Sequence, residues 1–102
     1  MGRVSREKPA RLAEKLVQIR TSLELSQDGI IRRMGLEERL SRDDISKYER
    51  GVREPSVLVL LRYARVAGVC MDALIDDELN LPTKLPTVPK HKGLTRASRR
   101  NK

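Results

Sequence analysis

One stretch of the chain decides the fold: Ser41-Arg42-Asp43-Asp44-Ile45-Ser46-Lys47-Tyr48-Glu49-Arg50-Gly51. Serine is a preferred helix N-cap, and an acidic residue three positions later completes a capping box, here in a shorter form with Asp44. Ile45 and Tyr48 stand three positions apart, so a helix places both on one face and leaves the polar residues on the other. Gly51 suits the left-handed conformation that follows many helices. The stretch therefore predicts a short helix with an apolar inner face and a polar, largely basic outer face.

Apolar residues before this stretch recur at steps of four, three and four positions: Leu12, Leu16, Ile19 and Leu23. That spacing predicts an amphipathic helix over residues 9–23. Ser26 is the N-cap expected for a second helix over residues 27–34, which Gly35 ends. Residues 36–40 then connect the second helix to the third.

The chain after the stretch predicts two further helices. Residues 57–61 are apolar and partly β-branched, which also fits a buried strand, but Ser56 supplies a helix N-cap and Gly68 a helix end. We therefore expect a helix over residues 57–67 and a fifth over residues 71–77. The residues of these two helices that we expect in the core are Leu60, Leu61, Ala64, Leu74 and Ile75. The predicted fold is all-α with five helices.

The scarcity of cysteine and histidine argues against several kinds of site. Cys70 is the single cysteine and His91 the single histidine, which excludes an internal disulfide and a multi-cysteine zinc site. Cys70 is expected to be a small, buried, reduced residue. The sequence has no apolar run near the roughly 18 residues of a membrane span and no apolar signal core at its N-terminus. We therefore expect a cytoplasmic protein that is not an enzyme and holds no metal or cofactor.

The positive charge of the chain is concentrated towards its C-terminal end. Residues 1–80 carry 15 Lys and Arg against 14 Asp and Glu, whereas residues 81–102 carry 7 basic residues and no acidic one. We expect a basic arm over residues 1–8, a folded domain over residues 9–78 and a disordered, proline-containing basic tail over residues 79–102. With 2 tyrosines as its only aromatic residues, the sequence lacks the stacking platform of single-strand binders, which favours duplex nucleic acid.

The third predicted helix and the residues after it resemble a known family. Tyr48-Glu49-Arg50-Gly51, followed by Glu54-Pro55-Ser56, is similar to the habitual ending of the recognition helix in the Cro/repressor-type (XRE) helix-turn-helix family. Five helices in this order, with Ser26-Gln27 opening the second, extend the resemblance over roughly residues 10–77. The resemblance implies a lambda-repressor-like domain whose second helix crosses the DNA backbone and whose third helix lies in the major groove. It therefore implies sequence-specific binding to double-stranded DNA.

The resemblance also assigns roles by position. The residues expected to contact DNA are Gln27, Ser41, Arg42, Asp43, Ser46, Lys47, Arg50 and Arg53. Among these, Gln27, Arg50 and Arg53 match positions that contact phosphates, and the others match the outward face that contacts bases. The residues expected to support the fold are Arg20, Gly35, Glu49, Gly51 and Pro55. Arg20 and Glu49 match a recurring ion pair that ties the first helix to the third.

Two features depart from the family pattern. The connection between Gly35 and Ser41 is longer than is usual, so it either bulges outward or extends the third helix backward. Asp43 and Asp44 bring negative charge to the end of the helix that is expected to face DNA. Asp44 is expected to cap the helix, while Asp43 either accepts from a cytosine amino group or, as we favour, pairs with Lys47 one turn on.

Two hypotheses about function share this DNA site. The first is a bacterial or phage-type transcriptional regulator, a small repressor that binds as a homodimer and is associated with the nucleoid when bound. The second is the antitoxin of a toxin–antitoxin pair, which uses the same fold on DNA and a further surface to neutralise a protein partner. The hypotheses differ in whether a cognate toxin exists.

Overall fold

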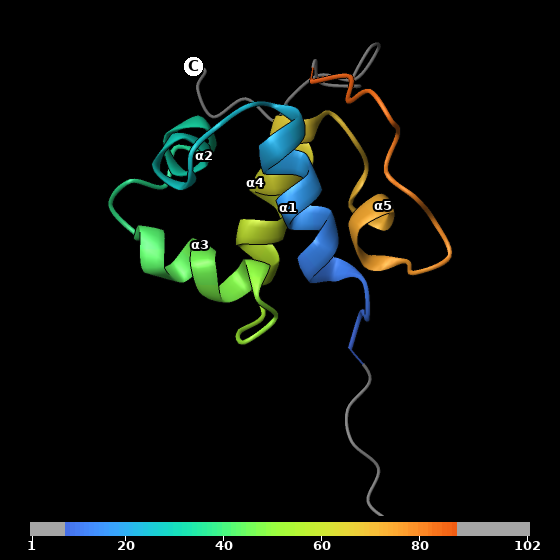
Figure 1. Cartoon of the computed structure of the whole chain (residues 1–102), viewed down its shortest axis with the longest axis horizontal. Coiled ribbons are helices and arrows are strands. Elements are labelled where there is room, and N and C mark those ends of the chain that lie inside the picture. Colours follow the sequence, from blue (N-terminus) through green and yellow to red (C-terminus); the bar gives the residue numbers. More distant parts are fainter. Residues whose placement is uncertain (1–7, 88–102) are drawn as a thin grey trace, which may run out of the picture.

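The computed structural model describes residues 8–87 of the chain, and this part is built from helices (Figure 1). The helices are α1 (Leu12–Ser22), α2 (Gln27–Met34), α3 (Arg42–Glu49), α4 (Val57–Ala67) and α5 (Met71–Ile75). Residues 8–87 contain no strand, so the predicted all-α fold with five helices is confirmed. None of the helices in this range is long and apolar enough to cross a membrane.

The helices pack around α1 and α4, which lie together at the centre of the molecule (Figure 1). Helices α2 and α3 pack against each other on one side of this pair, and α5 packs on the other side. The largest fully buried side chains come from all five helices: Lys15, Leu16, Ile19, Ile30, Ile45, Tyr63 and Leu74. The helices therefore share one core, which fixes the positions of α2 and α3.

Serine N-caps begin three of the helices, as the sequence predicts. The hydroxyl oxygen of Ser26 accepts from the backbone N–H of Gly29 at 2.9 Å, and Ser41 and Ser56 make the same bond to residues three positions on. The backbone N–H of Ser41 also donates to the Asp44 carboxylate at 2.8 Å, which completes the predicted capping box. These bonds satisfy N–H groups that have no partner within the helix.

The connection between α2 and α3 forms a turn and does not extend α3 backward. Gly35 adopts the left-handed conformation (φ 72°) that ends α2, and residues 37–39 make the turn. Leu36 is buried and Leu40 is half-buried against the core, so both ends of the turn are held. The longer connection therefore leaves the start of α3 at its N-cap, Ser41.

Three residues expected in the core are more exposed than predicted. Ile75 is 38% exposed and is the last residue of α5, which ends two residues before the predicted end; Leu74 is the buried residue of this helix. Leu61 is half-buried on the side of α4 that carries the exposed Val57 and Leu58. Cys70 is exposed, because it is the N-cap of α5 and lies outside the helix, so the prediction of a buried thiol is wrong.

Two polar contacts that the sequence did not predict join α1 to α5. Lys15 is fully buried, and its Nζ donates to the carbonyl oxygens of Ala73 at 2.7 Å and Asp76 at 2.9 Å. Burial lowers the pKa of Lys15. The Asp77 carboxylate accepts from the backbone N–H groups of Ala10 at 2.8 Å and Arg11 at 3.0 Å, and so caps α1 from the other end of the sequence. This cap lies at the start of α1, which begins at Leu12 and not at residue 9.

The first residues of the predicted tail are packed on the domain. We call residues 81–87 the C-terminal strap. Within it Leu81 and Leu85 are buried, and the backbone N–H of Thr87 donates to the Ala67 carbonyl oxygen at 3.0 Å. Residues 81–87, which the sequence analysis assigned to the tail, therefore pack on the domain through two leucines four positions apart, Leu81 and Leu85. The rest of the predicted tail and residues 1–7 of the predicted arm lie outside the described residues.

Candidate nucleic-acid interface

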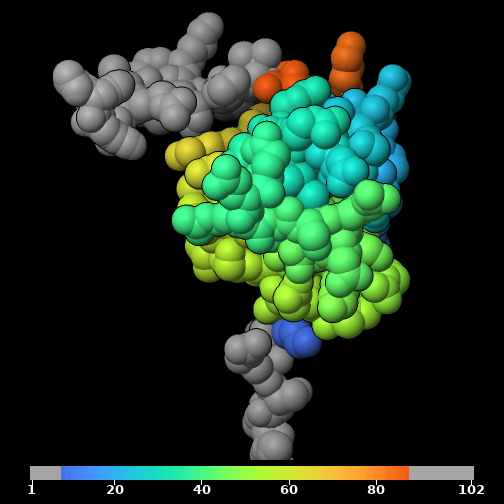
Figure 2. All heavy atoms as spheres, turned by 90° about the vertical axis from the view of Figure 1, so that its left-hand side faces the viewer, coloured from blue at the N-terminus to red at the C-terminus, as the bar shows by residue number. Residues whose placement is uncertain are grey.

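Helices α2 and α3 together form one side of the molecule, which faces the viewer in Figure 2 and which we call the α2–α3 face. The outer face of α3 lies on this side, and its polar residues are solvent-accessible. The side chains of Arg42 and Asp43 are 71% and 68% exposed, and that of Lys47 is 39% exposed. Ser41 and Arg50 are exposed and Ser46 is half-buried. The structure thus brings the residues predicted to contact bases onto one accessible surface.

The inner face of α3 is anchored in the core. Ile45 is fully buried and Tyr48 is 6% exposed, as the three-residue spacing predicts. Burying two large side chains of an eight-residue helix stabilises its position by a few kcal/mol, at roughly 1.5–3 kcal/mol for each side chain. The core therefore holds α3 in place, with its polar face towards the solvent.

The predicted ion pair between α1 and α3 is present and has two hydrogen bonds. Arg20 Nε donates to Glu49 Oε2 at 2.7 Å, and Arg20 Nη2 donates to Glu49 Oε1 at 3.1 Å. Arg20 Nη1 also donates to the Leu25 carbonyl oxygen at 3.0 Å. The hydrogen bond to Glu49 raises the pKa of Arg20. This bidentate pair is the geometry in which arginine and carboxylate interact most strongly, so it fixes α3 against α1 and the loop after it.

Gln27 joins the same group of side chains. Its Nε2 donates to Glu49 Oε1 at 3.3 Å, so Glu49 holds both Arg20 and the first residue of α2. Gln27 is half-buried. The sequence predicted a phosphate contact for Gln27, and the contact to Glu49 is additional to that prediction.

Exposed ion pairs and hydrogen bonds cross the outer face of α3. Lys47 Nζ lies 3.2 Å from Asp43 Oδ2, so the favoured intrahelical pair is present. Arg42 Nε lies 3.5 Å from Asp28 Oδ1 on α2. Arg50 Nε donates to Ser46 Oγ at 3.1 Å. Pairs at such exposure contribute at most about 1 kcal/mol, so other charged groups can displace them at little cost.

Arg53 lies in the turn after α3 and is held from two sides. Its guanidinium pairs with the Asp44 carboxylate and lies 5.6 Å from the centre of the Tyr48 ring. The backbone N–H of Ser41, together with Arg53, holds the pKa of Asp44 below its usual value. Asp44 therefore serves both as the predicted cap and as a partner for Arg53, which the sequence did not predict.

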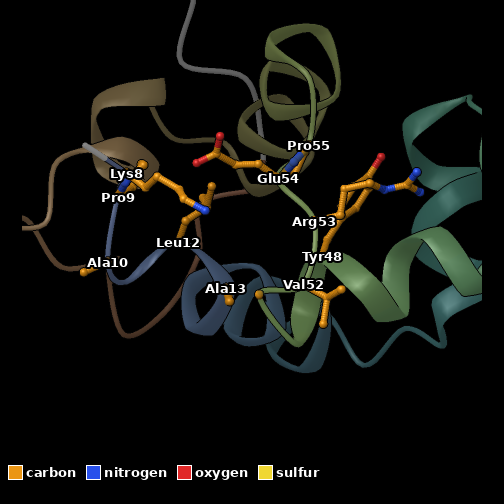
Figure 3. A pocket seen from close by; sticks show the side chains of 11 residues that line it. Lys8, Pro9, Ala10, Leu12, Ala13, Tyr48, Val52, Arg53, Glu54 and Pro55 are labelled. Carbon is orange, nitrogen blue, oxygen red and sulfur yellow. The ribbon is translucent and has the colours of Figure 1, made fainter. Parts of the chain in front are cut away.

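A hollow of about 270 Å³ separates the turn after α3 from the amino end of α1 (Figure 3). Lys8 and Pro9 lie on one side of it, and Arg53 lies on the other. Gly51 in this turn has a φ of 72°, where glycine is favoured over any other residue. Pro55 is buried, as expected for a structural position. The beginning of the described chain thus lies beside a turn that carries a residue predicted to contact phosphate.

The described residues hold no group of three or more His, Cys, Asp or Glu side chains that is placed to bind a metal ion.

A family model described as helix-turn-helix matches residues 16–74, which is more than half of the chain. The matched segment contains α2, α3 and α4 in full, with most of α1 and α5. Comparisons with curated proteins and with solved structures found no match. On its sequence and its fold, the chain belongs to the Cro/repressor-type helix-turn-helix family of DNA-binding regulators.

Proposed function

We propose that this protein binds one specific sequence of double-stranded DNA through the outer face of α3 and represses transcription there. The observation that carries the proposal is the contrast within α3, where Ile45 and Tyr48 are buried while Arg42 and Asp43 on the opposite face are exposed. A helix of this size fits the major groove, whose base edges distinguish all four base pairs. A protein bound at a promoter excludes the polymerase, which accounts for repression.

In this proposal the residues that contact DNA divide into two groups. Arg42, Ser41, Asp43, Ser46 and Lys47 contact base edges, while Gln27, Arg50 and Arg53 contact phosphates. The pairs of Arg42 with Asp28 and of Lys47 with Asp43 are exposed, so both cations are free to exchange their partners for DNA groups. Phosphate contacts set the position of the protein on the duplex, and base contacts provide the preference for sequence.

The proposal is tested by selecting bound sequences from a random duplex pool with the full chain. We expect one enriched motif and a Kd for it that is at least about 1,000-fold lower than for random duplex. Arg42→Ala should weaken that motif, whereas the matched variant Arg65→Ala, which removes the same charge from an exposed position on α4, should not. A pool that shows no enriched motif would contradict sequence-specific binding.

We also propose that the protein binds as a homodimer, in the cytoplasm and on the nucleoid. The expected motif is then a pair of inverted half-sites about one helical turn apart, since a two-fold dimer contacts a palindrome. Sedimentation of the protein–DNA complex gives the stoichiometry directly, and a single half-site bound by one protomer would contradict the dimer.

The antitoxin hypothesis shares the DNA site and adds a protein partner. It predicts that an adjoining reading frame encodes a toxin that this chain neutralises. Growth of cells that express the adjoining gene, with and without this chain, tests it. Equal growth under both conditions would contradict it.

A further inference from the structure

The first and the last residue of α3 are both contacted by the amino end of α2. Gln27, the first residue of α2, donates to the carboxylate of Glu49 at 3.3 Å, and Glu49 is the last residue of α3. Asp28, the next residue of α2, has its Oδ1 3.5 Å from Nε of Arg42, which is the first residue of α3. Consecutive side chains of α2 therefore hold the two ends of the helix that is proposed to enter the major groove.

The contact between Asp28 and Arg42 leaves part of the guanidinium available. Arginine has N–H groups on Nε and on both terminal nitrogens, arranged in a rigid planar fork. Asp28 lies against Nε, so Nη1 and Nη2 of Arg42 can still donate to other acceptors. Guanine presents two such acceptors in the major groove, O6 and N7, which an arginine contacts with two N–H groups at once. Arg42 can therefore contact a guanine without leaving Asp28.

Asp28 is a carboxylate on a surface that is proposed to face phosphates. Its side chain is 50% exposed, and it follows Gln27, which is proposed to contact a phosphate. A negative charge in this place repels the DNA backbone, so by itself it lowers the affinity for every sequence alike. The helix dipole favours an acidic residue in the first turn of α2, but that effect acts on stability and not on DNA binding. Asp28 can therefore favour DNA binding only through the residue that it contacts, which is Arg42.

We propose that Asp28 is a positioning residue for Arg42, whose guanidinium it holds so that the two terminal nitrogens donate to O6 and N7 of a guanine. The inference rests on the proposed function of the α2–α3 face and deepens it, because it makes the preference for this guanine depend on side chains from two helices. An arginine that is already ordered loses less freedom when it binds, and ordering one long side chain corresponds to about two- to tenfold in affinity. Asp28 thus raises the preference for guanine while it lowers the affinity for duplex DNA in general.

The test uses Asp28→Asn in the full chain and the base pair at which Arg42→Ala relaxes the selected motif. We call the ratio of affinities for motifs with and without guanine at that base pair the guanine preference. Asp28→Asn should lower the guanine preference by about two- to tenfold. It should bind random duplex at least as tightly as the parent, because a charge that repels phosphates is removed. Its melting temperature should match that of the parent, as expected of an exposed position, and Asp28→Glu should retain more of the guanine preference.

A double-mutant cycle tests whether Asp28 acts through Arg42. When Arg42→Ala is already present, adding Asp28→Asn should leave the remaining guanine preference unchanged, since no guanidinium is left to position. The matched control is Glu14→Gln. Glu14 Oε2 lies 3.0 Å from Nε of Arg11 at an exposed position, and Arg11 also bonds to Asn80, which follows α5. This control removes the same charge from the same kind of pair outside the α2–α3 face, so it should not alter the guanine preference.

The possible outcomes separate this inference from the proposed function. If Arg42→Ala relaxes one base pair and Asp28→Asn leaves the guanine preference unchanged, Asp28 does not position Arg42, and the inference alone fails. If Asp28→Asn weakens the motif and random duplex by the same factor, or has the same effect with and without Arg42, its role is structural and the inference also fails. If Arg42→Ala relaxes no base pair, the proposed contact of Arg42 with a base is itself wrong.

Discussion

The inner and outer faces of α3 carry the same chemistry, arginine beside a carboxylate, in two different environments. On the inner face, Glu49 has a side chain that is 7% exposed and lies 2.7 Å from Arg20. On the outer face, Arg42 lies 3.5 Å from Asp28, and their side chains are 71% and 50% exposed. The first pair joins α1 to α3 in the fold. In the second pair, Arg42 can leave Asp28 and bind another charged group at little cost in free energy. Burial, and not residue type, therefore separates the residues that support the site from those proposed to contact DNA.

The largest effect should come from breaking the inner pair. Glu49→Ala leaves Arg20 largely buried without its partner, and removing one side of such a pair costs about 3 kcal/mol of unfolding free energy. Gln27 also loses its contact, so DNA binding should weaken as a consequence. The matched change on the outer face, Asp28→Ala, should alter stability by about 0.5 kcal/mol or less. Denaturant unfolding measures both. Equal losses in the two variants would contradict the contrast between the faces.

A second test asks whether a buried side chain outside α3 also contributes more to the free energy of unfolding than an exposed one. Leu85→Ala should lower the free energy of unfolding by about 2 kcal/mol, because leucine-to-alanine changes in a core remove contacts and leave a cavity. Thr83→Ala, at an exposed position of the same strap, should change it by about 0.5 kcal/mol or less. Both are measured by denaturant unfolding. If both variants are as stable as the parent, the strap does not contribute to the core.

The outer face can be examined by its effect on sequence preference. Arg42→Ala should relax the preference at one base pair of each half-site by about 1–3 kcal/mol, the range for a bidentate arginine–guanine contact. Arg53→Ala should weaken all sequences alike, since a phosphate carries no base information. Repeating the selection with each variant separates the two expectations. The same uniform loss in both would show that Arg42 contacts the backbone.

The smallest effect concerns the acidic cap of α3. The pKa of Asp44 is held down in the folded state by the N–H of Ser41 and by Arg53, so its charged form is favoured by folding. Its contribution to stability is therefore present above the ordinary pKa of 3.8 and is lost as the pH falls through the lower, folded value. Asp44→Asn should lower stability at pH 7 by about 1 kcal/mol or less and reduce the loss between pH 4 and pH 2. Unfolding curves measured at several pH values provide the check. The same pH dependence in parent and variant would show that Asp44 does not contribute to the acid sensitivity.

Local signals in the sequence were sufficient to predict most of the helices and which residues of α3 lie on its surface. The serine N-caps and the glycines that follow α2 and α4 act within three or four residues, so their effect is visible in a short window. The spacing of Ile45 and Tyr48 fixed which face of α3 is buried. The pairing of Arg20 with Glu49 was available only from the family resemblance, since nothing in their separate surroundings indicates a contact.

The sequence by itself therefore determined the number and type of the helices, most of their bounds and the polar face of α3. Only the tertiary structure decided which polar and charged groups meet across the fold: Gln27 with Glu49, Arg53 with Asp44, Lys15 with the end of α5 and Asp77 with the start of α1. It also decided that the strap packs and that Cys70 is exposed. The reason is distance along the chain. A cap joins residues three positions apart, whereas Asp77 and Ala10 are 67 positions apart and meet only because the core has already placed α1 against α5.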